Sequence, residues 1–295
     1  MQEFVESFGM IREDPALDKE LSLKFDPKLV IWHGLGHGSS PVAVGGFQVV
    51  GPILLQMHLA YENENCFSVH GSAVLVAPGV ALCAKHVIED YVQSMHRRKF
   101  SGMCVALTTV GVQFWRLKTV TLVEGADLAV IGLIFASDLP PLNVFPVATI
   151  STKIPKENDI VHILGFRADA YTFDFPERET GRVTNIRYQG NVFQSSGQVT
   201  QVFPNGRDRY MLPGPSIEVT CTTFSGMSGG PVFNSQGFLI GLLSSSFEES
   251  PSYVSLLEPA LTTVYAGGWP QSWYQHHYKL VDVINDIPGY NPLKT

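Results

Sequence analysis

Short apolar runs that end at a glycine or a proline recur along most of this chain. The 295 residues include 27 glycines and 19 prolines, whereas an apolar repeat of helical period rarely continues beyond two turns. Runs of this kind form strands joined by tight turns. The pattern therefore predicts an all-β fold.

The clearest unit is "GSAVLVAPGVALCAKHV", residues 71–87. Pro78 and Gly79 predict a tight turn between two strands, and the apolar spacing in "KHVIEDYVQSM" predicts a short helix over 85–95. The aromatic segment 167–180 is expected to form a loop. Further strands are expected at 103–110, 112–123, 128–134, 159–165, 181–188, 191–203, 216–222, 231–233 and 238–244.

The composition, 45% hydrophobic and 16% charged, is that of a globular chain able to bury one large core or two small ones. The stretch "ASDLPPLNVFP", 136–146, holds three prolines between two strand-rich halves and predicts a connection between two compact β-barrels. The expected division is an N-terminal extension wrapped on the core (1–50), a first barrel (51–135), a linker (136–150), a second barrel (151–250) and a C-terminal extension with a short helix (251–295).

The charge of the chain argues against two classes of partner. A formal charge of −7 and a pI near 5.7 give no general attraction to nucleic acid or to an anionic membrane. The N-terminal residues lack the pattern of a secretory signal, and no run of about 18 apolar residues occurs, so a cytoplasmic location is expected. The cysteines show no CxxC pair and no zinc spacing, so we expect reduced, mostly buried thiols and no metal or cofactor; they are Cys66, Cys83, Cys104 and Cys221.

The segment "FSGMSGGPVF", 224–233, surrounds Ser228 with the glycines Gly226, Gly229 and Gly230. It can be a turn between strands, or it can hold a nucleophilic hydroxyl beside converging backbone N–H groups. A serine hydroxyl is a weak nucleophile unless an imidazole takes its proton, and that imidazole needs a group that fixes its tautomer. A catalytic Ser228 therefore requires a histidine and a carboxylate.

His86 and Asp127 are the candidates for these two roles. Of nine histidines, only His86 stands where a clear strand is followed by a short helix. Asp127, in "EGADLAVIGLI", begins an apolar strand, and an acid buried there needs a partner. The alternatives are a structural histidine at a strand end and an aspartate that caps a turn.

The order His86, Asp127, Ser228, within "ALCAKHV", "DLAVIGL" and "GMSGGPV", resembles the chymotrypsin-like (trypsin-like) serine peptidases. The spacings of 41 and 101 residues are similar to the family's, and the resemblance covers roughly residues 50–250. It implies two antiparallel six-stranded β-barrels with the site between them. Secreted members of the family carry a disulfide that brackets the histidine, but here Cys83 lies three residues before His86 and Cys66 is not at the matching place, so the resemblance is to bacterial or intracellular members without disulfides.

The resemblance also implies a role for each residue. Ser228 would attack the scissile carbonyl, His86 would act as general base and then general acid, and Asp127 would orient His86. The backbone N–H groups of Gly226 and Ser228 would form the oxyanion hole. The substrate-binding residues would be Thr222 and Thr223 at the floor of the specificity pocket, Ser244 beside the aspartate, and Ser244, Ser245 and Ser246 along the substrate backbone.

Two details qualify the expected activity. Met227 replaces the acid that pairs with a new N-terminus in members activated by cleavage, so that route is not expected. A neutral Thr222 does not favour Lys or Arg at the P1 position, although Glu248 or Glu249 could reach inward and reverse this preference.

The predicted function is that of a serine endopeptidase acting on proteins or peptides and restrained by residues 1–50 or by a regulatory protein partner. Two alternatives remain open. One is a latent or inactive binding module with the peptidase fold, activated by a partner. The other is an esterase or another acyl transferase that uses the same residues.

Overall fold

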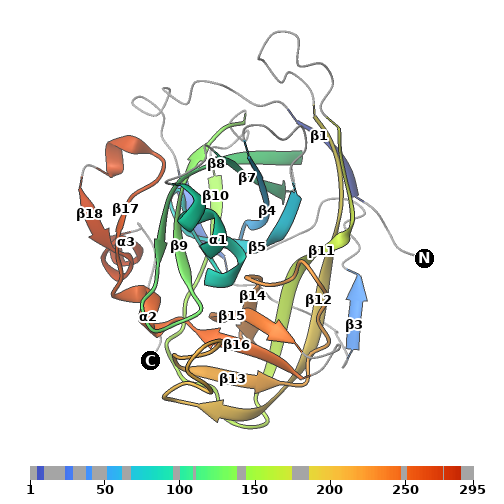
Figure 1. The fold of residues 1–295 in the computed structure, drawn as a ribbon, viewed down its shortest axis with the longest axis vertical. Coiled ribbons are helices and arrows are strands. Elements are labelled where there is room, and N and C mark those ends of the chain that lie inside the picture. Colours follow the sequence, from blue (N-terminus) through green and yellow to red (C-terminus); the bar gives the residue numbers. More distant parts are fainter. Residues whose placement is uncertain are drawn as a thin grey trace.

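The computed structural model describes most of the chain between residues 5 and 286. Two closed β-barrels, each of six antiparallel strands, lie one above the other, and helix α1 (Lys85–Met95) lies on the side of the first (Figure 1). This is the predicted all-β architecture. The described ranges are 5–9, 24–28, 38–41, 52–61, 68–95, 100–108, 111–137, 144–174, 186–246, 251–274 and 276–286.

The first barrel closes in the order β4-β5-β6-β9-β8-β7. Its strands are β4 (Leu54–Tyr61), β5 (Ser68–Ala77), β6 (Val80–Cys83), β7 (Phe100–Thr108), β8 (Gly111–Leu122) and β9 (Ala129–Phe135). The predicted hairpin is confirmed, with Leu75 opposite Ala81 across β5 and β6. No strand was predicted at β4, where Gln56 and His58 interrupt the apolar sequence; both are buried, and they share a hydrogen bond of 2.9 Å.

The second barrel closes because β12 pairs with both β11 and β13. Its strands are β11 (Ile160–Asp174), β12 (Ile186–Phe203), β13 (Ser216–Val219), β14 (Pro231–Asn234), β15 (Leu239–Ser246) and β16 (Ser252–Leu256). This barrel therefore extends past the expected boundary at residue 250. The short strand β10 (Val144–Ala148) lies between the two barrels in sequence.

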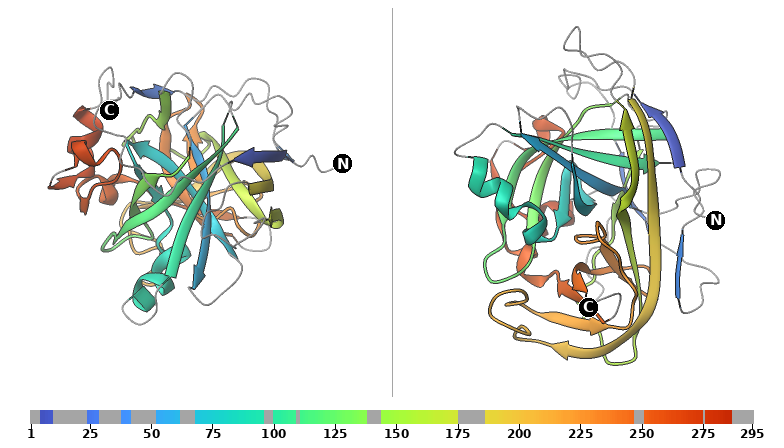
Figure 2. Two further views of the ribbon diagram at one scale, coloured as in Figure 1. Left: turned by 90° about the horizontal axis from the view of Figure 1, so that it is seen from above. Right: turned by 45° about the vertical axis from the view of Figure 1, so that its right-hand side comes forward.

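Two predictions around the β11–β12 hairpin are wrong. Residues 167–174 were expected in a loop, but β11 continues through them, with Tyr171 opposite Gly190. Two strands were expected at 181–188 and 191–203, but residues 186–203 form one strand, because pairing continues across Gly190; residues 181–185 lie outside the described residues. Figure 2 shows β11 and β12 as a long curved pair along one side of the molecule.

Residues from the N-terminal 50 cover strand edges. β1 (Val5–Gly9) and β3 (Gly38–Pro41) pair antiparallel with β12, and β2 (Lys24–Lys28) pairs parallel with β10. The edge of β12 that faces away from β11 is thus covered in succession by β1, β3 and β13. An uncovered strand of this length would expose many unpaired backbone groups.

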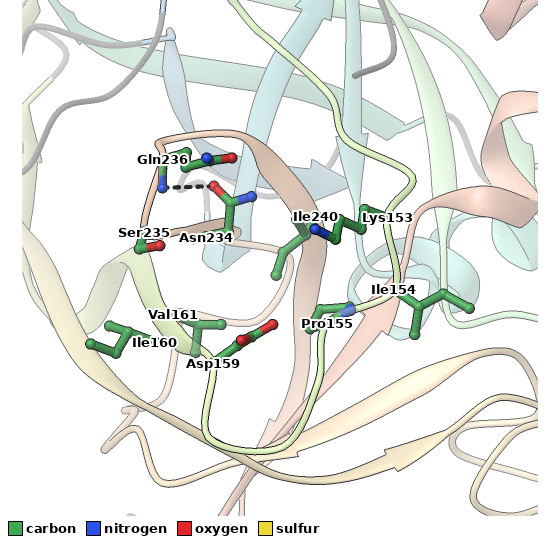
Figure 3. A pocket seen from close by; sticks show the side chains of 10 residues that line it. All are labelled: Lys153, Ile154, Pro155, Asp159, Ile160, Val161, Asn234, Ser235, Gln236 and Ile240. Carbon is green, nitrogen blue, oxygen red and sulfur yellow. Dashed lines mark hydrogen bonds between the residues drawn. The ribbon is translucent and has the colours of Figure 1, made fainter. Parts of the chain in front are cut away.

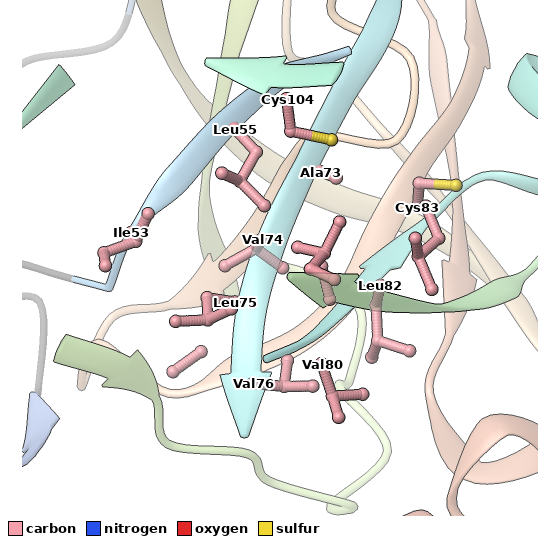
Figure 4. Packing of buried hydrophobic residues seen from close by; sticks show 14 of the residues in the cluster. Ile53, Leu55, Ala73, Val74, Leu75, Val76, Val80, Leu82, Cys83 and Cys104 are labelled. Carbon is pink, nitrogen blue, oxygen red and sulfur yellow. The ribbon is translucent and has the colours of Figure 1, made fainter. Parts of the chain in front are cut away.

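The core of the first barrel explains why β5 is apolar on both faces. Ala73, Val74, Leu75 and Val76 are all fully buried, although successive side chains point to opposite sides of a strand. One set points into the barrel, and the other faces β10 and the second barrel, which contact β5. Figure 4 shows this packing, with side chains from β4, β5, β6 and β7 around the same strand.

The C-terminal segment packs beside the first barrel (Figure 1). It contains helix α2 (Glu258–Leu261), strand β17 (Val264–Ala266), the 3₁₀ helix η2 (Gln271–Trp273), strand β18 (His277–Lys279) and helix α3 (Leu280–Asp286). Trp269 contacts the rings of Trp115, Phe135 and Phe145, with centroids 5.2 to 6.0 Å away. The first barrel's core cluster therefore includes residues as late as Ile284. No helix in the described ranges is both long and apolar enough to cross a membrane.

Candidate active site

His86 is fixed at the start of helix α1, directly after strand β6. The predicted helix over 85–95 is confirmed. The His86 backbone N–H donates to Asp127 Oδ1 at 3.0 Å, and its ring Nδ1 lies 2.9 Å from Asp127 Oδ2. The His86 side chain keeps 38% of its surface exposed, whereas Asp127 keeps only 7%. The pair therefore has a buried acid and an accessible base.

Asp127 lies in the turn between β8 and β9, which is closed by the Val123 N–H donating to Leu128 O at 2.9 Å. Its carboxylate accepts the two bonds from His86 and a short one from Ser244 Oγ. Burial raises the pKa of the Asp127 carboxyl, but the hydrogen bonds from His86 and Ser244 and the attraction to the imidazole outweigh it, so that pKa lies below its ordinary value. The carboxylate is ionised at neutral pH.

The charge of Asp127 decides the proton position on His86. An ionised carboxylate only accepts hydrogen bonds, so Nδ1 of the neutral imidazole carries the hydrogen. Nε2 is then an acceptor, as a general base requires.

Ser228 joins this group through Ser244. Ser228 Oγ donates to the backbone carbonyl of Ser244 at 3.2 Å, and Ser244 Oγ donates to Asp127. The described part of the chain contains no hydrogen bond between Ser228 and His86. A serine hydroxyl reaches a new acceptor by rotating about χ1, and catalytic hydrogen bonds are often long or misaligned without substrate.

Backbone conformation and close contacts explain why glycines stand on both sides of Ser228. Gly226 has φ +91° and Gly229 has φ +79°, values that residues with a Cβ rarely adopt. A Cβ on Gly226 would lie 2.5 Å from Ala168 N, and one on Gly229 would lie 2.2 Å from Ser72 O. The loop is therefore packed closely against both barrels.

The backbone of this loop is held mostly by its carbonyl groups. Ser225 O accepts from Ala168 N–H at 2.9 Å, Met227 O from Gly230 N–H at 2.8 Å, and Ser228 O from Ser72 N–H at 2.8 Å. Among the described residues, the N–H groups of Gly226 and Ser228 have no acceptor. These are the two amides that the sequence singled out.

The other predicted site residues lie near Ser228 in sequence and differ in exposure. Thr223 is buried, and its Oγ1 lies 2.8 Å from Ser252 Oγ, which donates to Cys221 O at 2.8 Å. Thr222 is half-buried. Along β15, Ser244 is buried, Ser245 half-buried and Ser246 exposed. Glu248 and Glu249 lie outside the described residues.

Sequence reasoning missed Ser72 and the backbone of β11. Ser72 Oγ contacts both Gly226 and Phe166, and Ala168 N–H holds Ser225. A polar residue inside the apolar run "GSAVLVA" was a signal for Ser72. Nothing in the sequence marks Ala168, because its contribution is a backbone amide that every residue except proline has.

The structure also contains a cavity away from these residues. It has a volume of about 190 Å³ and is lined by the β14–β15 turn and by residues of the 153–161 segment (Figure 3). Its lining includes none of His86, Asp127 and Ser228. It is therefore separate from the candidate active site.

Comparison with known proteins shows which protein family the chain belongs to. The sequence profile of the trypsin-like peptidase domain matches residues 71–242, which is more than half of the chain. The chain therefore belongs to the trypsin-like peptidase family. No curated protein matches it significantly.

Several solved structures match the chain at low sequence identity. Deg5 matches with a TM-score of 0.50 and 17% identity, over 73% of this chain and 88% of that chain. Glu endopeptidase matches with a TM-score of 0.48 and 18% identity, over 77% and 93%. The active form of the Rv3671c protease from M. tuberculosis matches with a TM-score of 0.46 and 15% identity, over 78% and 85%. At such identity the likeness to Deg5 shows the fold alone.

Proposed function

We propose that this protein is a serine endopeptidase that hydrolyses peptide bonds in protein or peptide substrates. Ser228 attacks the carbonyl carbon, His86 takes the hydroxyl proton and gives it to the leaving amine, and Asp127 stabilises the imidazolium. Water, deprotonated by His86, then attacks the acyl group, which leaves as a carboxylic acid while His86 returns the proton to Ser228. The observation that carries this proposal is the group of contacts that brings His86, Asp127 and Ser228 together: Asp127 bonds the ring of His86 and the hydroxyl of Ser244, and the backbone carbonyl of Ser244 accepts from Ser228. It connects residues that are 142 positions apart in the sequence.

The oxyanion of the tetrahedral intermediate would be bound by the N–H groups of Gly226 and Ser228. Two observations support this assignment: neither amide has an acceptor among the described residues, and the carbonyls on the preceding residues, Ser225 and Met227, are held by other backbone groups. Donors fixed before the reaction stabilise developing charge without reorganisation.

Substrate would bind along β15. One edge of β15 pairs with β16 as far as Ser246. The other edge pairs with β14 and the loop before it, but in the described structure this pairing ends at Leu243, so the backbone beyond Leu243 is open on that edge. An extended substrate can add there as a strand. The hydroxyls of Thr223 and Ser252, which lie 2.8 Å apart, would form a neutral pocket floor, which favours a neutral P1 residue rather than Lys or Arg.

The site would form without proteolytic activation. Met227 is fully buried within the core cluster of the second barrel. A buried thioether anchors the loop by packing, whereas an acid at this position would need a cationic partner.

The proposed location is the cytoplasm, because cysteines stay reduced in that compartment. Cys83, Cys104 and Cys221 are free and buried. Burial raises the pKa of the Cys104 and Cys221 thiols to about 12, which keeps them protonated and unreactive.

The test compares the parent protein with Ser228→Ala. The purified proteins are incubated with a mixed peptide library, and the cleaved bonds are identified by mass spectrometry. Ser228→Ala should lose at least about 10⁴-fold in rate, while Ser235→Ala, at an exposed serine of the same barrel, should cleave like the parent. Equal cleavage by Ser228→Ala contradicts the proposal.

A second candidate is a binding module with this fold that does not turn over. It is favoured by one observation: the Ser228 hydroxyl donates to Ser244 O instead of to His86. A fluorophosphonate, which reacts with activated serines, separates the two functions. Prompt stoichiometric labelling at Ser228 supports the peptidase, and no labelling supports the binding module.

A further inference from the structure

The side chain of Ser72 links the first barrel to the nucleophile loop. Ser72 lies in β5 and is fully buried. Its backbone N–H donates to Ser228 O at 2.8 Å. Its hydroxyl donates to Gly226 O at 3.0 Å and accepts from Phe166 N–H at 2.9 Å. One residue thus contacts both barrels and the loop between Ser225 and Gly230.

The direction of these bonds is fixed by their chemistry. A hydroxyl has one hydrogen, a carbonyl can only accept, and a backbone N–H can only donate. The Ser72 hydrogen must therefore point to Gly226 O, and a lone pair must face Phe166 N–H. The hydroxyl has a single orientation that satisfies both neighbours.

This bond holds one of the two peptide groups that flank Gly226. In a trans peptide the C=O and the N–H point to opposite sides. Ala168 N–H donates to Ser225 O, which fixes the orientation of the Ser225–Gly226 peptide and so the direction of the Gly226 N–H. Ser72 Oγ donates to Gly226 O, which fixes the orientation of the following Gly226–Met227 peptide. Because glycine lacks a Cβ and Gly226 has φ +91°, its local sterics resist rotation of these groups only weakly.

We propose that Ser72 is a positioning residue: its hydroxyl holds the Gly226–Met227 peptide and so limits rotation at Gly226, which keeps the adjoining Gly226 N–H facing the carbonyl oxygen of the substrate. This inference rests on the proposed peptidase function and adds a residue to it. In the described structure, the Ser72 side chain makes no hydrogen bond with His86 or with the Ser228 hydroxyl. Removing the Ser72 hydroxyl should therefore weaken binding of the transition state and leave the proposed base, His86, unchanged.

The test uses three variants of the full chain. Ser72→Ala removes the hydroxyl, and Ser72→Thr keeps it. Ser137→Ala is the matched control, because Ser137 is also buried and its Oγ also accepts from a backbone amide, Phe114 N–H at 2.7 Å, far from the loop in sequence. Circular dichroism and thermal melts establish the folded fraction of each protein.

Two measurements are then made on the folded proteins. The first is the rate constant of fluorophosphonate labelling at Ser228 as a function of pH. Ser72→Ala should label about 10- to 100-fold more slowly than the parent, a partial loss of one oxyanion donor, with an unchanged pH midpoint. Ser72→Thr and Ser137→Ala should stay within about fivefold of the parent.

The second measurement, amide hydrogen exchange of peptides covering residues 222–232, does not depend on catalysis. Exchange there should be at least about tenfold faster in Ser72→Ala than in Ser137→Ala, because the loop loses an anchor. Unchanged exchange overturns the inference, and so does faster exchange with labelling as fast as in Ser137→Ala. If the parent itself is not labelled but exchange still differs, Ser72 positions the loop and the peptidase proposal fails.

Discussion

Asp127 binds His86 through both of its carboxylate oxygens, one to the backbone N–H at 3.0 Å and one to the ring Nδ1 at 2.9 Å. The first bond fixes where helix α1 begins, and the second fixes the orientation of the ring. The same carboxylate therefore sets both the backbone and the side chain of the proposed base.

Replacing this carboxylate with an amide should nearly abolish turnover. In Asp127→Asn the amide can donate to Nδ1, which would place the imidazole hydrogen on Nε2 and remove the acceptor that Ser228 needs. We expect kcat to fall by about 10³- to 10⁴-fold, measured by steady-state hydrolysis of a peptide identified in the library screen. Asp159→Asn, at an exposed carboxylate that accepts from Lys156 N–H at 2.8 Å, is the control. A loss below tenfold in Asp127→Asn would contradict the assignment.

Ser244→Ala should have a smaller effect with a diagnostic pH shift. The variant removes a hydrogen bond to the Asp127 carboxylate but keeps the carbonyl that accepts from Ser228. Losing a donor to the charged form raises the pKa of Asp127. We expect kcat/KM to fall about 10-fold, and the part of the activity loss in acid that comes from protonation of Asp127 to begin at higher pH. Ser216→Ala is the control, because the Ser216 hydroxyl is buried with no partner in the described structure, and it should leave the profile unmoved.

Gly226→Ala should inactivate the protein while Gly125→Ala does not. Both glycines have positive φ, +91° and +68°. A Cβ at 226 would meet Ala168 N at 2.5 Å and Phe166 O at 2.8 Å, whereas a Cβ at 125 would meet nothing within 4 Å. Each alanine carries the strain of positive φ, of order 1 kcal/mol, but only Gly226→Ala must displace the loop. Fluorophosphonate labelling and thermal melts of the two variants measure this difference, and equal labelling would refute it.

His58 should make the protein sensitive to acid. Burial and, to a lesser extent, the charge of His70 lower the pKa of His58 from 6.5 to about 3. Below pH 6.5, His58 is protonated in the unfolded chain but stays neutral in the folded protein. The free energy of unfolding therefore falls as the pH falls from 6.5 to about 3. At 1.36 kcal/mol per pH unit, about 3 kcal/mol is lost by pH 4.

The check is urea unfolding of His58→Gln between pH 4 and pH 7. Its free energy of unfolding should depend less on pH than that of the parent, whereas His277→Gln, at an exposed histidine, should keep the parent's slope. An identical slope in His58→Gln would exclude His58 as the cause. Below pH 4, protonation of Asp127 adds a further loss, because its pKa is lower in the folded protein.

Removing residues 1–41 should make the protein associate. The deletion takes away β1 and β3, which leaves the edge of β12 unpaired at residues 186–190 and 193–196, and it also removes β2 from β10. Unpaired edges bind other strands. Light scattering should show larger species as concentration rises, and thermal melts should begin at lower temperature than in the parent. A deletion variant that associates no more than the parent and is equally stable would show that β1 and β3 do not protect the edge of β12.

The sequence was sufficient to predict which side chains lie together. A serine among glycines, a histidine after a strand and an aspartate before one are each ambiguous alone, but their order and spacing predicted one site, and Ser228, His86 and Asp127 lie in one hydrogen-bonded group with Ser244. Their catalytic roles remain predictions. The division into domains also remains a prediction, although the strands show that the second barrel extends to Leu256.

The sequence was insufficient where backbone groups or unusual strands decide the structure. The Ala168 amide and the Ser244 carbonyl are groups that other residues share, so no residue type marks them. β3 has the sequence "GSSP", without apolar alternation, and β4 contains buried polar residues. Such strands form because a neighbouring edge supplies their partner, which overrides local propensity.

The packing of Trp269, Leu280 and Ile284 into the first barrel has a consequence for how this protein is made. Chains emerge from the ribosome with the N-terminal part first, and domains generally fold as they appear. Here the half that carries His86 must wait for Trp269, Leu280 and Ile284 before its hydrophobic cluster is complete. The nascent polypeptide therefore stays incompletely packed around His86 until residues well beyond the second barrel have been synthesised.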